Sequence, residues 1–90
     1  MNRQQILDKA ASIVSGDRDT QYGKPENSFA DIAALWTAYL EFEIQPEDVG
    51  HMMILLKIAR TKGPINKADN YIDIAGYAAC VAEFADTPGE

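Results

Sequence analysis

Two cations lie on the apolar side of a strongly hydrophobic segment. Between residues 49 and 61, Lys57 and Arg60 are the only fully charged side chains. At about 100° per residue on a helical projection, Arg60 falls between Val49 and Met53, and Lys57 lies next to it. An arginine fork and a lysine point charge are the usual partners of phosphate oxygens. The pair therefore predicts an anion site; the alternative is two side chains that complement the negative end of their helix.

A second segment supplies the opposite charge. Asp69 and Asp73 are four residues apart, so in a helix they share one face, flanked by Asn70 and Tyr77. Asp69 also suits a first helical turn, where the helix dipole favours an acid. Asp73 lies one turn deeper and needs a counter-charge, either one of the two cations or a bound metal ion. Gly76 lies in mid-helix, at a cost of about 1 kcal/mol relative to Ala, and predicts close approach by a helix or a ligand.

The fragment QYGKP offers a third set of candidates. Tyr22 can stack on a base, Gly23 allows a backbone turn and Lys24 can reach a phosphate; an ordinary tyrosine-glycine turn would look the same. His51 stands alone, without the spacing of a zinc site, and the glycine-rich phosphate-binding patterns are absent from the sequence. The single Cys80 is expected to be a small buried apolar residue.

Four helical segments must position these residues. They are expected at about residues 2–15, 26–43, 46–62 and 67–85, with a loop at 16–25 and a disordered tail at 86–90. No segment alternates apolar and polar residues as a strand does. The expected class is all-α, a compact four-helix domain with the third helix central, because residues 49–58 are apolar almost all round. The second helix is expected to bury Phe29, Ile32, Ala33, Trp36, Tyr39 and Leu40.

The composition of the chain limits the kinds of partner that it can bind. The chain has 90 residues and a net charge of -6, which argues against a grip on long DNA or RNA. No apolar run is long enough to span a membrane, and the N-terminus has no secretory pattern, so we expect a cytoplasmic protein. A core this small makes a homo-oligomer the expected assembly.

Three segments carry a resemblance to a known family. DRDTQYGKPENSFADIAALWTAYL, PEDVGHMMILLKIAR and DNYIDIAGYAA cover most of residues 17 to 79. With them the chain resembles a family of small uncharacterised proteins of bacteriophages and prophages. Such a protein would act in the host-cell cytoplasm.

More distantly, the helical layout and the acidic last helix look like the MazG-like all-α nucleotide pyrophosphohydrolases. That resemblance implies an oligomer that holds Mg²⁺ between two acidic helices and cleaves a nucleoside triphosphate to the monophosphate and pyrophosphate. Where the second acidic helix of those enzymes has Glu and Asp three residues apart, this chain offers Asn70 and Asp73, or Asp69 and Asp73 four apart. The first offers only Glu26 and Asp31, five residues apart, where those enzymes have two glutamates three apart.

The leading hypothesis is a protein that binds a nucleotide or a nucleotide-derived phosphate ligand. If it is an enzyme, it hydrolyses a nucleoside triphosphate with Mg²⁺ in MazG-like fashion. Asp73 and Glu26 are its candidate catalytic residues, and Asp73, Asp69 and Asp31 its candidate metal ligands. The candidate ligand-binding residues are Lys57, Arg60, Asp69, Asn70, Tyr22, Lys24 and Tyr77. Two alternatives remain. One is a non-catalytic phage protein that sequesters a linear or cyclic nucleotide used as a defence signal, and the other is a structural or protein-interaction module.

Overall fold

The computed structural model describes residues 1–15 and 24–85, with the side chain of Glu26 excepted. Four helices make up this part of the chain, and none of its residues is in a strand: α1 (Arg3–Val14), α3 (Pro25–Leu40), α4 (Pro46–Arg60) and α5 (Ala68–Ala85). The prediction of an all-α, four-helix protein is confirmed. The predicted loop at 16–25 lies almost wholly outside the described residues, and the predicted tail at 86–90 lies entirely outside them.

Local side-chain chemistry explains where the helices begin. The Asn2 side chain accepts a hydrogen bond from the Gln5 backbone N–H at 2.9 Å, and the Gln5 side chain accepts one from the Asn2 N–H at 2.8 Å. This reciprocal cap satisfies N–H groups that the first helical turn leaves without partners. At α4, Asp48 accepts a hydrogen bond from the Gln45 N–H at 2.9 Å, and Pro46 occupies the first helical position. The expected bounds of α1, α4 and α5 agree with the structure to within two residues.

The C-terminus of α3 differs from the prediction. The helix ends at Leu40 rather than at residue 43, because Glu41 adopts a left-handed backbone conformation with φ 54° and ψ 36°. The chain then turns back along α3. The Ile44 N–H donates to Thr37 Oγ1 at 2.8 Å, and that hydroxyl donates to the Ile44 carbonyl at 3.3 Å. These two bonds hold the segment before α4 against the last turn of α3.

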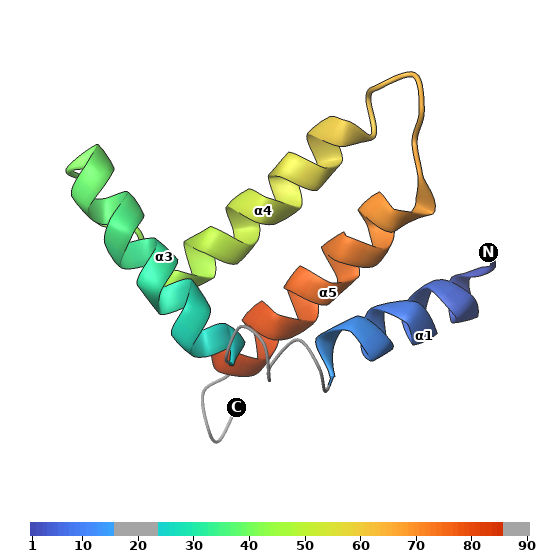
Figure 1. Cartoon of the computed structure of the whole chain (residues 1–90), viewed down its shortest axis with the longest axis horizontal. Helices are drawn as coiled ribbons and strands as arrows, with labels where there is room; N and C mark the ends of the chain where they lie inside the picture. The colour runs from blue at the N-terminus through green and yellow to red at the C-terminus, as the bar shows by residue number, and fades with distance from the viewer. Residues whose placement is uncertain (16–23, 86–90) are drawn as a thin grey trace.

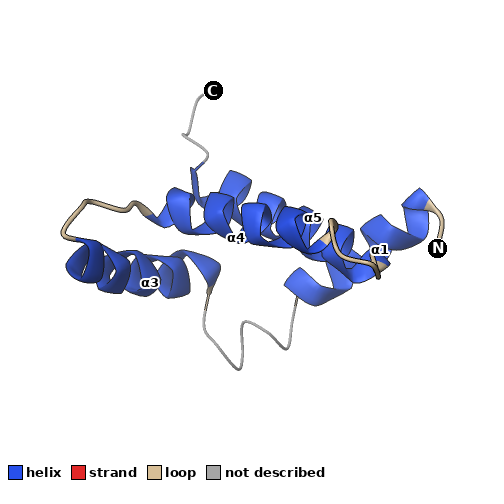
Figure 2. Cartoon of the chain, turned by 90° about the horizontal axis from the view of Figure 1, so that it is seen from above, coloured by secondary structure: helices blue, strands red, loops and turns tan. Residues whose placement is uncertain are grey.

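The helices pack around the α4–α5 pair. These two helices run antiparallel and are joined by the segment 61–67, with α1 along the far side of α5 and α3 crossing the start of α4 (Figure 1). The view from above shows α3 and α1 at opposite ends of the pair (Figure 2). The predicted third helix, α4, packs between α3 and α5, as a central helix should. The last helix, α5, contacts all three others.

The core lies where α3, α4 and α5 meet. Phe29, Ala33, Val49 and Val81 are its buried members, and the Phe29 ring meets Phe84 edge-on with 5.4 Å between centroids. Residues packed against this cluster are partly buried: Ile32, Trp36, Ile44, Met53, Tyr77 and Phe84.

The predicted burial of Tyr39 and Leu40 is wrong. Their exposed fractions are 81% and 56%. They lie in the last turn of α3, which the returning chain contacts at Thr37. The described residues leave most of both side chains uncovered.

Two glycines permit close helix contacts. A Cβ atom on Gly50 of α4 would overlap the Val81 side chain of α5 and lie 3.3 Å from the Phe29 ring. A Cβ on Gly76 of α5 would lie 3.4 Å from Val14 Cγ1 of α1. The close approach predicted at Gly76 is therefore made by a helix, α1.

None of the described helices is both long and apolar enough to cross a lipid bilayer.

Candidate functional site at the α4–α5 turn

An ion pair links α4 to α5 one turn inside their joined ends. Lys57 Nζ lies 2.8 Å from Asp73 Oδ2, and the two side chains are 13% and 33% exposed. The prediction that Asp73 needs a counter-charge is confirmed, and the partner is Lys57. Removing one member of such a pair leaves a poorly solvated charge behind. Because each charge compensates the other, the pair holds both side chains in place.

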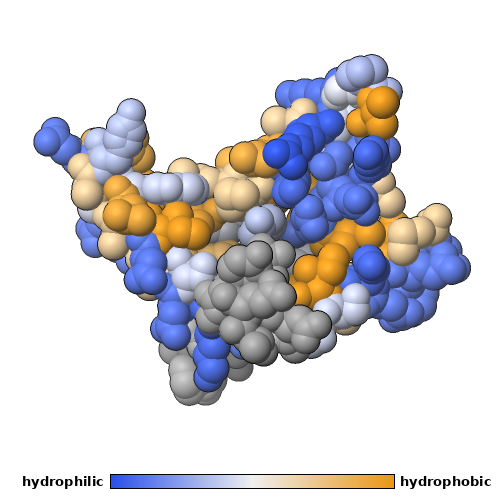
Figure 3. All heavy atoms as spheres, in the orientation of Figure 1, coloured by the Kyte–Doolittle hydropathy of each residue, from blue (hydrophilic) through white to orange (hydrophobic). Residues whose placement is uncertain are grey.

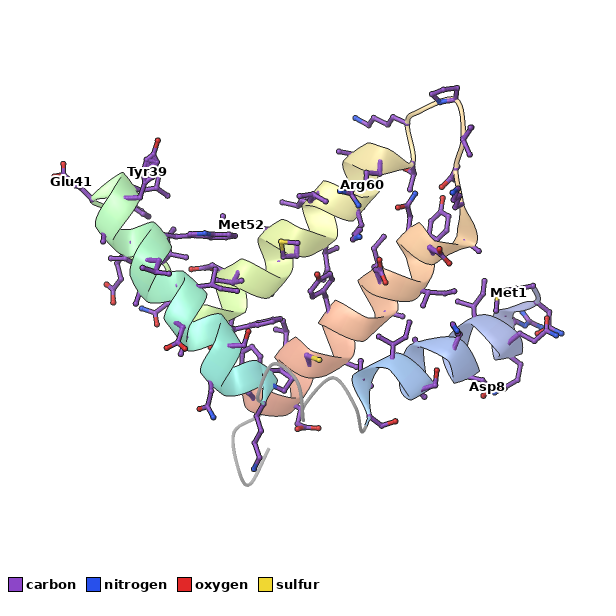
Figure 4. All side chains as sticks on the ribbon, in the orientation of Figure 1. Met1, Asp8, Tyr39, Glu41, Met52 and Arg60 are labelled. Carbon is purple, nitrogen blue, oxygen red and sulfur yellow. The ribbon has the colours of Figure 1, made fainter. Side chains whose placement is uncertain are left out.

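Arg60 lies three residues beyond Lys57 in the last turn of α4, where a cation complements the helix dipole. Its side chain is exposed and, among the described residues, has no carboxylate within ion-pair distance. Figure 4 shows it on the side of α4 that faces α5. Arg60 is thus a guanidinium beside a fixed ion pair, with its hydrogen-bond donors available to an anion.

Amide groups and a phenol surround the start of α5. Asn66 Nδ2 donates to the Tyr71 hydroxyl at 3.0 Å, and Asn70 Nδ2 donates to Asn66 Oδ1 at 3.4 Å. Asp69 is exposed in the first turn and Asn70 is half-buried. The structure therefore places Asp69 and Asn70 in the first turn of α5, one turn before Asp73. This first turn is also the N-terminus of α5, which is the positive end of the helix dipole.

Sequence reasoning missed two cations near this site. Lys62 and Lys67 lie near the two ends of the connecting segment 61–67, and both are exposed. Together with Lys57 and Arg60 they make up four of the eight cations of the chain, and no acid interrupts the run from 57 to 67. We call these four residues the basic cluster. Its signal was readable in the sequence as a basic stretch in an otherwise acidic chain.

Of three other candidates, two lie away from this site, and the structure does not describe the third. Tyr22 lies outside the described residues. Lys24 and the backbone of Glu26 lie at the start of α3, where nearby Phe29 packs against Phe84 near the end of α5. Asp73 precedes Phe84 by three turns, or roughly 16 Å at 1.5 Å per residue. Within one chain, Glu26 and Asp73 therefore lie at opposite ends of α5.

Tyr77 belongs to the core side of α5. Its ring centroid lies 6.2 Å from that of Phe29, and its side chain is half-buried against the apolar cluster. Much of the ring surface that would stack on a base already contacts protein.

The described residues of one chain do not fit a magnesium centre. No three acidic, histidine or cysteine side chains among them gather closely enough to hold a metal ion. Asp31 is exposed on α3, Asp69 is exposed on α5, and Asp73 is paired with Lys57. Magnesium prefers several oxygen ligands in near-octahedral geometry. Bound Mg²⁺ stays a prediction.

Comparison with known proteins gives a family and two relatives. The profile described as Domain of unknown function (DUF6378) matches residues 5–85. The Gene 55 protein of Mycobacterium phage D29 is 46% identical over 85 residues, which cover 94% of this chain and 56% of that protein. The Gene 55 protein of Mycobacterium phage L5 is 47% identical over 74 residues, covering 81% and 47% respectively. The chain spans about half the length of these relatives. No solved structure gives a match. The expected relation to phage proteins is confirmed.

Proposed function

Since this chain belongs to the DUF6378 family, whose description names no activity, its function must be argued from its own residues, and we propose that it binds a phosphate-bearing small molecule of the nucleotide class at the α4–α5 turn. The observation that carries the proposal is the exposed guanidinium of Arg60 beside the Lys57–Asp73 ion pair. An arginine without a carboxylate partner offers a planar fork of donors that matches phosphate oxygens.

The surroundings of Arg60 suit an anion. Lys62 and Lys67 add two exposed cations to the same end of the molecule, while the chain as a whole carries a charge of -6. Local cations of this kind raise the concentration of an anionic ligand near the site even on an acidic protein. The first turn of α5 adds backbone N–H groups and the positive end of its dipole.

The nucleoside part of such a ligand has polar partners nearby. Asn70 carries both an amide donor and an amide acceptor, and Asp69 carries an exposed carboxylate. Either can bind the edge of a base or the hydroxyls of a ribose. Nucleotides are also the ligand class that the resemblance to MazG-like enzymes implies.

We propose binding without turnover within one chain. Asp73 Oδ2 lies 2.8 Å from Lys57 Nζ, so this carboxylate is occupied by an ion pair, and the backbone of Glu26 lies at the far end of α5. A protein that holds a nucleotide without cleaving it acts by sequestration, and in a phage protein the ligand can be a nucleotide defence signal of the host.

Titration calorimetry tests the proposal with ATP, a cyclic dinucleotide and inorganic pyrophosphate, each with and without Mg²⁺. We expect the wild-type chain to bind at least one nucleotide, and Arg60→Ala to weaken it by about tenfold or more, as loss of a charge-assisted hydrogen bond does. Arg3→Ala removes an exposed arginine from α1 and is the matched control, with unchanged affinity expected. Since Arg60 is exposed, its removal should change the free energy of unfolding by less than about 0.5 kcal/mol.

Absence of heat with every ligand, or equal affinity of the Arg60→Ala chain, contradicts binding at this site. Release of inorganic phosphate in the presence of a pyrophosphatase contradicts the absence of turnover.

A second function, protein interaction, is favoured by a different observation. Large apolar side chains lie uncovered on α3 and α4.

A further inference from the structure

The two helices that cross at the start of α4 carry apolar side chains that the described part of the chain does not cover. We call these residues the outer apolar face: Leu35, Tyr39 and Phe42 in and after α3, and Met52, Leu55 and Leu56 in α4. Their exposed fractions run from 36% at Met52 to 81% at Tyr39. Only six hydrophobic residues in the described chain are buried, two of them alanines. The protein therefore leaves more large apolar side chains in water than it buries.

These residues form continuous stripes rather than scattered points. Met52, Leu55 and Leu56 have the i, i+3, i+4 spacing that lines one side of a helix, and Ala59 extends the row by another turn. On α3, Leu35 and Tyr39 are four residues apart and share a side. None of these positions is charged. Such stripes are typical of helices that pack against other helices.

The figures place the two stripes on facing walls. Tyr39 of α3 and Met52 of α4 both lie on the side of their helices that borders the opening between them (Figure 4). The space-filling view shows a notch there, with hydrophobic atoms on both walls (Figure 3). The notch is therefore an apolar groove between two helices.

The whole chain exposes more surface than a compact monomer of its mass. The protein exposes 6620 Å², whereas a folded monomer of 9.9 kDa is expected to expose roughly 5,200 Å². The difference of about 1,400 Å² exceeds the roughly 800 Å² that each partner buries in a standard interface. The radius of gyration agrees, at 14.2 Å against about 12 Å for a compact chain of this length.

We infer that a second copy of this chain covers the outer apolar face, with α3 of each copy packed against α4 of the other about a two-fold axis. This self-association goes beyond the proposed ligand binding, although its basic border shares Arg60 and Lys62 with the basic cluster.

Two properties of the face select a second copy as the partner. The helices have nearly equal length, with 16 residues in α3 and 15 in α4, so each matches the other along its whole stripe. Opposite charges also border the stripes. Glu41 and Glu43 follow the end of α3, and Arg60 and Lys62 stand at the end of α4. A two-fold arrangement repeats each contact and can bring the acidic end of one copy to the basic end of the other.

Light scattering coupled to size-exclusion chromatography tests the inference on the full chain. We expect the wild-type protein at micromolar concentration to have twice the chain mass of 9.9 kDa, or a multiple of that dimer. Leu55→Glu should shift the protein to the monomer mass, because a carboxylate at 62% exposed Leu55 costs little in one chain but much in a buried interface. Leu7→Glu is the matched control: Leu7 is 57% exposed on α1, outside the face, and its variant should remain dimeric.

Circular dichroism checks that the Leu55→Glu chain keeps its helices. If it does not fold, Leu35→Glu on α3 is the second variant, with the same expected change in mass. A monomeric wild-type protein overturns the inference. A helical Leu55→Glu or Leu35→Glu chain that stays dimeric overturns it too.

Discussion

The two ends of the α4–α5 pair are held together by opposite kinds of contact. At the start of α4, Val49 is 1% exposed, and Gly50 lets the helix backbone approach Val81 of α5. At its end, the contact is the Lys57–Asp73 ion pair, with Arg60 exposed beside it. An apolar contact depends on shape and leaves no group for chemistry, whereas an ion pair contributes little net stability but keeps charges in place. The apolar end of the α4–α5 pair therefore fixes the fold, and the polar end is available for a ligand.

Phe29→Ala, at the apolar end of the α4–α5 pair, should cause the largest loss of unfolding free energy. Phe29 is 8% exposed and contacts both Phe84 and Tyr77. Its truncation should cost about 3–5 kcal/mol of unfolding free energy, out of roughly 5–13 kcal/mol expected for a chain of this size. Urea unfolding followed by circular dichroism measures the loss. The control is Leu7→Ala on the exposed side of α1, with a change below about 0.5 kcal/mol. Equal losses for both variants would contradict the assignment of the core.

Gly50→Ala adds one carbon at the apolar end of the α4–α5 pair. The new Cβ would overlap the Val81 side chain, and overpacking costs about 1–3 kcal/mol, against a gain of about 1 kcal/mol from helix propensity. A net loss of up to about 2 kcal/mol is expected in urea unfolding.

Gly76→Ala is the control for this substitution, because its Cβ would meet Val14 Cγ1 at 3.4 Å, close to ordinary contact. There the propensity gain should dominate, with a change between zero and about 1 kcal/mol of added stability. A stabilising Gly50→Ala would show that α4 and α5 have room to move apart.

The polar end should respond less, and its response should depend on the partner. Asp73→Ala leaves half-buried Lys57 without its counter-charge and should cost about 1–2 kcal/mol, below the value for a fully buried pair because Asp73 is 33% exposed. Lys57→Met alone should cost a similar amount.

In the double variant the two losses should not add, because neither charge is left unpaired. The coupling free energy from the four-member cycle, measured by urea unfolding, is the readout. Additive losses would mean that the 2.8 Å pair has no energetic consequence.

Local signals in the sequence predicted the helices well. Pro46, Glu47 and Asp48 mark the start of α4, and the observed helix begins at Pro46. The end of α3 was missed because Glu41, rather than a glycine, takes the left-handed conformation. Such a conformation in a non-glycine residue depends on tertiary contacts, here the bonds between Thr37 and Ile44.

The candidate site was predicted only where its residues are close in sequence or share a helix face. The need of Asp73 for a counter-charge followed from its depth in the helix, and the structure identifies Lys57 as the partner. The distance between Glu26 and Asp73 depends on how α3 crosses the other helices, which periodicity does not encode. The burial of Tyr39 failed for the same reason, since a helical projection shows which side is apolar and not what covers it.

The packing of α1 against α5 has a consequence for chain entropy. The other main helix contacts join α3, α4 and α5, which follow one another along the chain, whereas the approach of Val14 to Gly76 closes a loop through about two thirds of the protein. Loop-closure entropy rises slowly with length, by only about 0.6 kcal/mol for each doubling. The docking of α1 therefore costs only slightly more closure entropy than the contact of Phe29 with Phe84, which closes a loop almost as long. The burial of Ala10 and Gly76 lets two backbones come close enough for dispersion contacts to offset it.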